Sequence, residues 1–178
     1  MGWQWQGARG EIAKYCKNNN IPESQISLLG INEWQGVYKK VLESFVEHSY
    51  SLLNGLHWAN TNNGFRSDVD MVFSFREGLS GTASYEWLER LCEIVGEQKV
   101  YLLVEEISQK YCICECDSSA VHLVINEMIY PSDYYITDKK FNWLISENHH
   151  DVVLFLGKGF DEEKIRSVCL KCDQEEVF

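Results

Sequence analysis

Short connections between strand-like segments constrain the fold of this chain more than any other feature. In the C-terminal half, segments rich in β-branched and aromatic residues at positions 134–137, 143–147 and 152–156 follow one another closely. Residues 100–107 and 111–116 form a similar pair. Consecutive strands with such short connections pair antiparallel, because a parallel pair needs a crossover of a dozen or more residues. We therefore expect a mostly antiparallel sheet.

A long amphipathic helix is expected at residues 33–54. Asn32 and Gln35 resemble a capping box at its start, and Gly55 supplies the stop. Its apolar side chains recur at spacings of three and four, which places them on one stripe. The stripe comprises Trp34, Val37, Tyr38, Val41, Leu42, Phe45, Leu52 and Leu53.

Alternation of apolar and polar residues at positions 69–76 predicts a strand after this helix. Val69, Met71, Phe73 and Phe75 fall on one side of it. We expect the helix to pack Val41, Leu42 and Phe45 against the sheet at Met71 and Phe73.

Shorter helices are expected elsewhere in the chain. One surrounds Ile12, a second lies between Pro22 and Gly30, and a third follows Ser84 as its N-cap. Asp161 caps a closing helix that carries Ile165, Val168, Cys169 and Cys172. Residues 121–129 fit either a helix or a strand, and we favour a helix capped by Ser118 or Ser119. Together these elements predict a single α+β domain over residues 1–178, with the sheet packed against the long helix.

The charge balance narrows the classes of partner. The 178 residues carry 27 acidic and 16 basic side chains, a net charge of −11. This charge disfavours broad attraction to nucleic acid or to anionic membranes, and it suits a basic protein partner. The N-terminus has no signal-peptide pattern, and no apolar run approaches the length of a membrane helix. We therefore expect a cytoplasmic protein.

Seven cysteines allow two interpretations. Cys112, Cys114 and Cys116 alternate on a strand and so share one face, while Cys169 and Cys172 lie about a turn apart on a helix. Together they could supply the soft ligands of a zinc site. We favour the alternative that they are reduced, small apolar residues of the core, and we expect no metal and no cofactor.

Two adjacent histidines mark the connection before the last strand. Glu147, His149, His150 and Asp151 bring imidazoles and carboxylates to one turn, where they could move protons or bind a metal. The alternative is a polar turn whose Asn148 and Asp151 satisfy the backbone.

Acidic residues gather near the expected hairpin at residues 100–116. An acidic surface that also carries aromatic residues suits the capture of a basic protein, because complementary potentials steer association. The residues that we expect to contact such a partner are Trp143, Glu147, His149, His150, Asp151, Glu105, Glu106 and Glu115.

One segment resembles a known family. The run Tyr134-Tyr135-Ile136-Thr137-Asp138-Lys139-Lys140-Phe141-Asn142-Trp143-Leu144, followed by Glu147-Asn148-His149-His150-Asp151, is similar to an uncharacterised bacterial domain family. More loosely, the chain resembles the immunity proteins of bacterial toxin systems. Neither resemblance names catalytic residues.

The sequence thus favours binding over catalysis. We expect an immunity-type protein that occludes a basic toxin and binds neither nucleic acid nor membrane. Two alternatives remain open: a small hydrolase that uses the turn at His149, His150 and Asp151, and a zinc-stabilised interaction domain.

Overall fold

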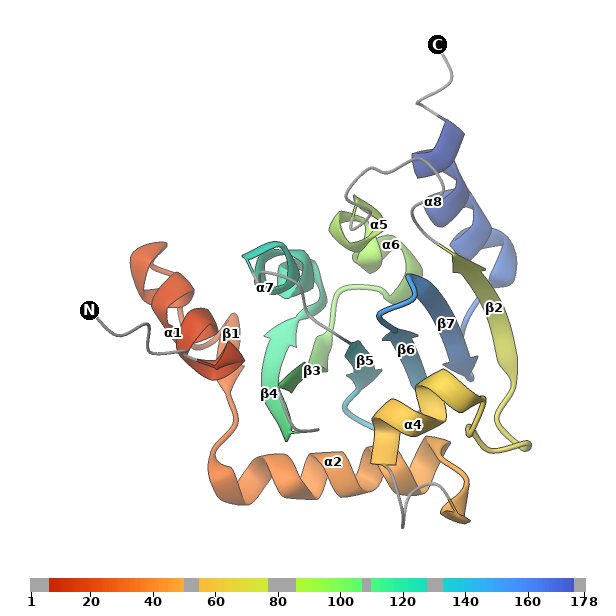
Figure 1. Cartoon of the computed structure of the whole chain (residues 1–178). Helices are drawn as coiled ribbons and strands as arrows, with labels where there is room; N and C mark the ends of the chain where they lie inside the picture. The colour runs from red at the N-terminus through yellow and green to blue at the C-terminus, as the bar shows by residue number, and fades with distance from the viewer. Residues whose placement is uncertain (1–6, 50–54, 77–85, 107–109, 128–132, 175–178) are drawn as a thin grey trace.

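An antiparallel sheet forms the centre of the computed structural model, which describes residues 7–49, 55–76, 86–106, 110–127 and 133–174 (Figure 1). Its strands are arranged in the order β1-β4-β3-β5-β6-β7-β2, and each neighbouring pair is antiparallel. The strands are β1 (Ile26–Leu28), β2 (Met71–Arg76), β3 (Lys99–Glu106), β4 (Lys110–Asp117), β5 (Tyr134–Asp138), β6 (Trp143–Glu147) and β7 (Val152–Gly157). The predicted α+β class is confirmed.

Helices cover both faces of the sheet, which gives three layers (Figure 1). One face carries α2 (Ile31–Phe45) and α4 (Gly55–Asn62). The other carries α1 (Ala8–Asn18), α5 (Glu86–Glu89), α6 (Leu91–Val95), α7 (Val121–Glu127) and α8 (Glu162–Gln174). Among these helices, none is long and apolar enough to cross a lipid bilayer.

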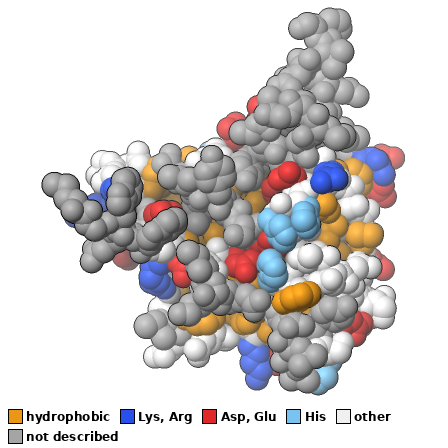
Figure 2. Space-filling model, viewed as in Figure 1, with side chains coloured by type: hydrophobic (Ala, Val, Ile, Leu, Met, Phe, Trp, Pro, Cys, Tyr) orange, Lys and Arg blue, Asp and Glu red, His pale blue; other side chains and the backbone are white. Residues whose placement is uncertain are grey.

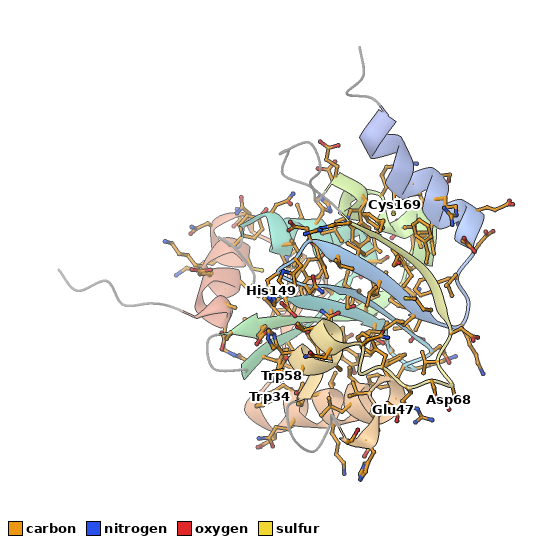
Figure 3. All side chains as sticks on the ribbon, turned by 45° about the vertical axis from the view of Figure 1, so that its right-hand side comes forward. Trp34, Glu47, Trp58, Asp68, His149 and Cys169 are labelled. Carbon is orange, nitrogen blue, oxygen red and sulfur yellow. The ribbon has the colours of Figure 1, made fainter. Side chains whose placement is uncertain are left out.

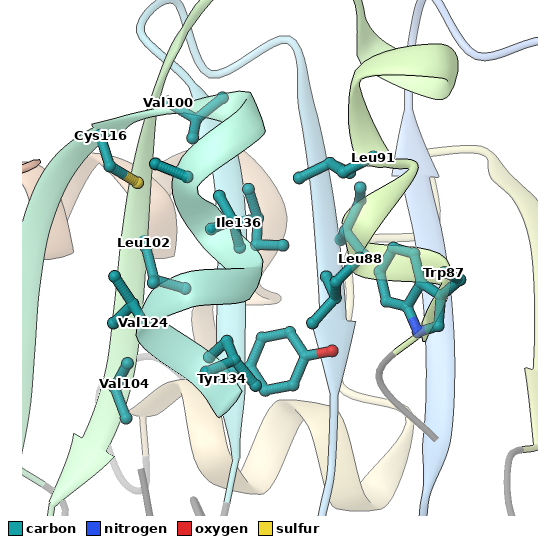
Figure 4. Packing of buried hydrophobic residues seen from close by; sticks show 14 of the residues in the cluster. Trp87, Leu88, Leu91, Val100, Leu102, Val104, Cys116, Val124, Tyr134 and Ile136 are labelled. Atoms are coloured by element: carbon teal, nitrogen blue, oxygen red, sulfur yellow. The ribbon is translucent and has the colours of Figure 1, made fainter. Parts of the chain in front are cut away.

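Two hydrophobic clusters follow from the alternation of side chains along the central strands. In β3, Leu102 and Val104 point into the cluster under α5, α6, α7 and α8, where Figure 4 shows them near Val124. Leu103 points into the opposite cluster, under α2 and α4. The central strands are therefore buried on both faces, which explains their nearly continuous apolar sequence.

The long helix ends earlier than its stripe predicts. α2 runs from Ile31 to Phe45, and Val46 is already extended, bridging to Phe65. Predicted residues 50–54 lie outside the described residues. The capping box predicted at Asn32 and Gln35 is wrong: Gly30 is the N-cap of α2, and its backbone N–H donates to the Glu33 carboxylate at 2.9 Å. After α2 the backbone groups are satisfied by pairing with a distant segment, since Arg66 N–H donates to the Phe45 carbonyl and Glu47 N–H to the Gly64 carbonyl.

The prediction for α2 is correct for the buried face of the helix and wrong for the strand residues that this face contacts. Val41 and Phe45 are buried and Leu42 is partly buried, but their cluster contains neither Met71 nor Phe73. Phe73 packs on the opposite face of the sheet, and Met71 is 58% exposed. The register of β2 against β7 shifts between these two residues, and this irregularity breaks the simple alternation.

A predicted helix between Pro22 and Gly30 is wrong. Pro22 instead starts a turn, and β1 then pairs with the edge of β4, with Ile26 opposite Cys116. The unpaired edge of β4 offers backbone hydrogen bonds that a short helix cannot match, so tertiary pairing overrides the local pattern.

The remaining elements largely follow the predictions. Residues 121–127 are helical, but a 3-10 turn at Ser118–Ala120 precedes them, and the Ser118 hydroxyl donates to the Gly96 carbonyl rather than capping the helix. The predicted helix after Ser84 is two short ones, α5 and α6, and Ser84 lies outside the described residues. The Asp161 cap is confirmed, since its carboxylate accepts from the backbone N–H groups of Glu163 and Lys164.

Candidate functional site at the turn between β6 and β7

Four titratable side chains from separate segments meet beside the turn between β6 and β7. His57 comes from α4, Glu105 from the end of β3, Asp133 from the residue before β5, and His149 from the turn itself. His57 Nδ1 lies 2.9 Å from Glu105 Oε2 and 3.5 Å from Asp133 Oδ2. His149 Nδ1 lies 3.1 Å from Asp133 Oδ1. The Asp133 carboxylate therefore lies between two imidazoles.

The sheet register brings these residues together. Val104 pairs with Tyr134 and Tyr134 pairs with Glu147, so the end of β3, the start of β5 and the end of β6 lie together at one end of the sheet. The Glu105 backbone N–H donates to the Asp133 carbonyl at 3.0 Å. The backbone N–H of His149 donates to Asp133 Oδ1 at 3.1 Å, which fixes the turn against the start of β5.

The turn has its own local support. The Asn148 side-chain oxygen accepts from the backbone N–H groups of His150 and Val152, as expected of an Asx turn. Asp151 adopts a positive φ of 59°, a conformation that Asp tolerates better than most residues. Residues of the turn thus hold the backbone, as the structural interpretation of this motif predicts, while His149 turns toward Asp133.

A buried polar network holds the Asp133 carboxylate in place. Its side chain is fully buried, and Asp133 Oδ2 accepts from Asn60 Nδ2 at 3.3 Å and from the Tyr135 hydroxyl at 3.1 Å. The Ser146 hydroxyl donates to Asn60 Oδ1 at 3.0 Å and so orients the amide. Burial raises the pKa of Tyr135 well above its ordinary value, so this hydroxyl remains a donor at neutral pH. The carboxylate is therefore oriented by donors from three elements.

Imidazoles are the only basic side chains of the described residues that form ion-pair contacts with the two carboxylates of the site. Within the described part of the chain, no Lys or Arg forms an ion pair with Glu105 or Asp133. Burial raises the pKa of Glu105 above its ordinary value, while the hydrogen bond with His57 opposes this rise. Two carboxylates whose side chains are at least nine-tenths buried thus lie beside two imidazoles that are partly exposed.

The imidazoles connect this interior to solvent. The side chains of His149 and His57 are 40% and 25% exposed, against 7% for Glu105. Figure 2 shows histidine side chains at the surface with acidic side chains beside them. His150 is exposed, and its ring centroid lies 4.1 Å from that of His149. The arrangement can bind a cation from solution or hold an imidazole ready to take a proton.

His57, Asp133 and His149 form the one group in the described residues that could hold a metal ion. One donor atom from each lies within 4.8 Å of the others. Cys112, Cys114 and Cys116 do share one buried face of β4, as predicted, and Cys169 is buried in the same cluster. They form no such group of three, and the side chain of Cys172 lies outside the described residues.

The structure separates the residues that we predicted as one site. Glu147 is buried and accepts from the Tyr134 hydroxyl on the opposite face of the sheet, so it does not face His149. The carboxylate that contacts His149 is Asp133, whereas the sequence predicted Glu147 and Asp151 in this role. Trp143 is also buried, with its ring 5.5 Å from that of Phe160.

The predicted acidic contact residues are also dispersed. Glu105 lies in the histidine site, while the Glu106 carboxylate accepts from the backbone N–H of Arg9 at 3.3 Å. Glu115 forms an ion pair with Lys139. The predicted contact residues therefore do not form one continuous surface.

Sequence reasoning missed His57, Asn60 and Asp133. His57 and Asn60 lie three residues apart on one face of a short helix, a spacing that could have marked them as a pair. Asp133 directly precedes the apolar run of β5, where a buried carboxylate is not expected. Their relation to His149 depends on the register of three strands, which local pattern does not reveal.

Comparison with known proteins gives one match. The sequence model of a family described as "Family of unknown function (DUF6756)" matches residues 4–168. Searches of curated proteins and of solved structures found no match to this chain.

Proposed function

Because the chain belongs to the family of unknown function DUF6756, its relatives assign it no role, and we propose from its own chemistry that it acts by binding a basic protein. The proposed action is that of a bacterial immunity protein in the cytoplasm, which occludes the active surface of a basic toxin. The observation that carries this proposal is an exposed aromatic and imidazole surface on a strongly acidic chain.

Electrostatics supports this proposal. Six basic residues of the described chain already form ion pairs with acidic neighbours. They are Lys39, Arg66, Arg90, Lys99, Lys139 and Arg166. With a net charge of −11, the protein attracts cationic partners over about 8–10 Å at physiological ionic strength.

The contact surface that we propose comprises Trp58, His149 and His150, and we call it the α4–turn surface. Trp58 is 42% exposed and follows His57 on α4, and the His57 ring stacks on His149. Figure 3 shows Trp58 on α4 and His149 in the neighbouring turn. Tryptophan is the residue type most enriched among side chains that dominate binding energy at protein interfaces.

A direct test uses the product of the reading frame next to this gene. The two purified proteins are mixed and their dissociation constant is measured at rising salt concentration. We expect tight binding that weakens with salt, inhibition of the neighbour's toxicity, and a loss of about 2 kcal/mol or more for Trp58→Ala.

Met71→Ala is the matched control. Met71 is the other large hydrophobic side chain that is exposed in the described residues, and it lies on β2 at the far edge of the sheet. Its truncation is expected to leave binding unchanged. Absence of binding, or equal loss in both variants, contradicts the proposal.

A small hydrolase is the second candidate, and one observation favours it. The buried Asp133 carboxylate holds His149 Nδ1, which leaves Nε2 to accept a proton from a water molecule. A screen of ester and phosphodiester substrates would test this, with His149→Gln expected to lower any turnover by about 10²–10⁴-fold. Turnover that survives this substitution excludes His149 as the base.

A further inference from the structure

The donor set at Asp133 matches the preferences of a particular class of metal ion. His57 and His149 offer imidazole nitrogens, Asp133 offers a carboxylate, and these donors lie within 4.8 Å of one another. Two imidazoles with one carboxylate are typical of zinc and related divalent transition metals, whereas magnesium and calcium prefer sites built entirely from oxygen.

The charge of the site favours a bound cation. The Asp133 and Glu105 side chains are 0% and 7% exposed, and no Lys or Arg of the described residues pairs with them. Buried charges in proteins are paired or coordinate metals, because an isolated buried carboxylate is very costly. One divalent ion carries the charge that would balance the two carboxylates.

The surrounding hydrogen bonds fix the orientation of the Asp133 carboxylate. Asn60 and Tyr135 both donate to Asp133 Oδ2, and Ser146 in turn orients Asn60. Such hydrogen-bond partners hold a metal ligand in one orientation. The side-chain entropy of Asp133 is therefore already lost on folding, before a metal ion binds. His149 at 40% exposure leaves a path from solvent.

We propose that His57, Asp133 and His149 bind one divalent transition metal ion, with zinc the best match. Glu105 lies beside His57 and adds the second negative charge. Three protein ligands leave a coordination position for water or for a group from another molecule.

Metal binding at this position would join two separate elements. His57 belongs to α4, which carries Trp58, and His149 belongs to the turn that carries His150. An ion shared by both histidines would hold the α4–turn surface in one arrangement and so reduce the entropy lost on binding a partner. This last step rests on the proposed function, whereas the metal site itself does not.

The test uses the full-length protein without an affinity tag, stripped of metal with a chelator. Zinc is titrated by calorimetry, and cobalt(II) is titrated by its visible absorption, which is intense in four-coordinate sites. We expect one equivalent to bind, with nitrogen and oxygen rather than thiolate ligation in the cobalt spectrum. His57→Ala and His149→Ala are each expected to weaken binding by about 100-fold or more, since loss of an outer partner alone costs about 10–100-fold.

A control variant and a measurement of folding separate ligand loss from misfolding. His48→Ala removes an exposed histidine that follows α2, and we expect it to bind zinc as the parent does. Circular dichroism establishes that each variant is folded, and His149 is the more exposed ligand and so the less disruptive to replace. Absence of saturable binding, or binding that survives both ligand substitutions, overturns the proposal.

The metal measurement is independent of any partner. If zinc binds with the expected histidine dependence but the neighbouring protein does not bind, the metal inference stands and the immunity proposal fails. If the partner binds equally with and without zinc, only the coupling between metal and binding surface is lost.

Discussion

His57 and His149 stack with their ring centroids 5.6 Å apart and their planes 10° from parallel. One lies on a helix of the first third of the chain and the other in a turn near its end. Their contact exists because α4 lies beside the end of the sheet where β3 and β6 end and β5 begins. By itself the turn is a polar connection. Packing places the imidazole of His57 and the buried carboxylate of Asp133 beside its own His149.

The two tyrosines at the start of β5 provide a matched pair for the metal site. The Tyr135 hydroxyl donates to Asp133, while the adjacent Tyr134 hydroxyl donates to Glu147 on the opposite face of the sheet. We expect Tyr135→Phe to weaken zinc binding by about 10-fold and Tyr134→Phe to leave it unchanged. Calorimetric titration of both variants checks this. Equal effects would show that the hydrogen bond to Asp133 does not orient a ligand.

Removal of the Phe45 ring tests the packing of α2. Phe45 is buried between α2 and the sheet, so Phe45→Ala is expected to lower the free energy of unfolding by about 3–5 kcal/mol. Met71→Ala, at an exposed site, is expected to change it by less than ~0.5 kcal/mol. Urea denaturation followed by circular dichroism measures both. A small loss for Phe45→Ala would mean that the cluster under α2 is not a stabilising core.

Two glycines at and after the end of β7 separate backbone strain from steric overlap. Gly157 and Gly159 have φ values of 99° and 91°, which L-residues rarely adopt. A Cβ at Gly159 meets nothing within 4 Å, so we expect Gly159→Ala to cost about 1–3 kcal/mol from the backbone alone.

At Gly157 a Cβ would overlap the Asn142 carbonyl oxygen and lie 2.9 Å from Trp143 Cα. Gly157→Ala is therefore expected to cost clearly more than Gly159→Ala, by about 1–3 kcal/mol of overpacking. Thermal unfolding of the two variants provides the comparison. Equal losses would show that the backbone of the Asn142 turn moves away at little cost.

Thiol reactivity tests the placement of the strand cysteines. Burial raises the pKa of Cys112 to about 12, so at pH 8 only about one molecule in 10⁴ carries the reactive thiolate there. We expect Cys112, Cys114 and Cys116 to resist iodoacetamide in the native protein and to react in urea. Peptide mass spectrometry locates the modified residues. Rapid native modification of these three would contradict their burial under α7.

Several features of the fold are determined by the sequence alone. The three C-terminal strands, the β3–β4 hairpin and the Asp161 cap of α8 all follow from alternation, turn length and capping chemistry within a few neighbouring residues. Short connections also require antiparallel pairing, because no crossover fits between such strands. These features are predictable because the interactions that stabilise them are local.

Other features were decided only by tertiary contacts. Residues 26–28 form a strand that pairs with the edge of β4, and α2 ends at Phe45, where the chain pairs with the segment around Phe65. Met71 became exposed because β2 shifts its register on β7. In each case a backbone hydrogen bond to a distant segment outweighed a local preference, which is worth only a fraction of a kilocalorie per residue.

The candidate site also has a part that local sequence determines and a part that tertiary contacts determine. The sequence identified His149 as a titratable residue in a well-formed turn, and the turn itself needs only Asn148 and its neighbours. The choice of Asp133 and His57 as its partners, and the exclusion of Glu147, required the register of β5 against β3 and β6 and the position of α4. A change of register by one residue reverses which face a side chain meets, so the chemistry of this site is settled by strand pairing rather than by local sequence.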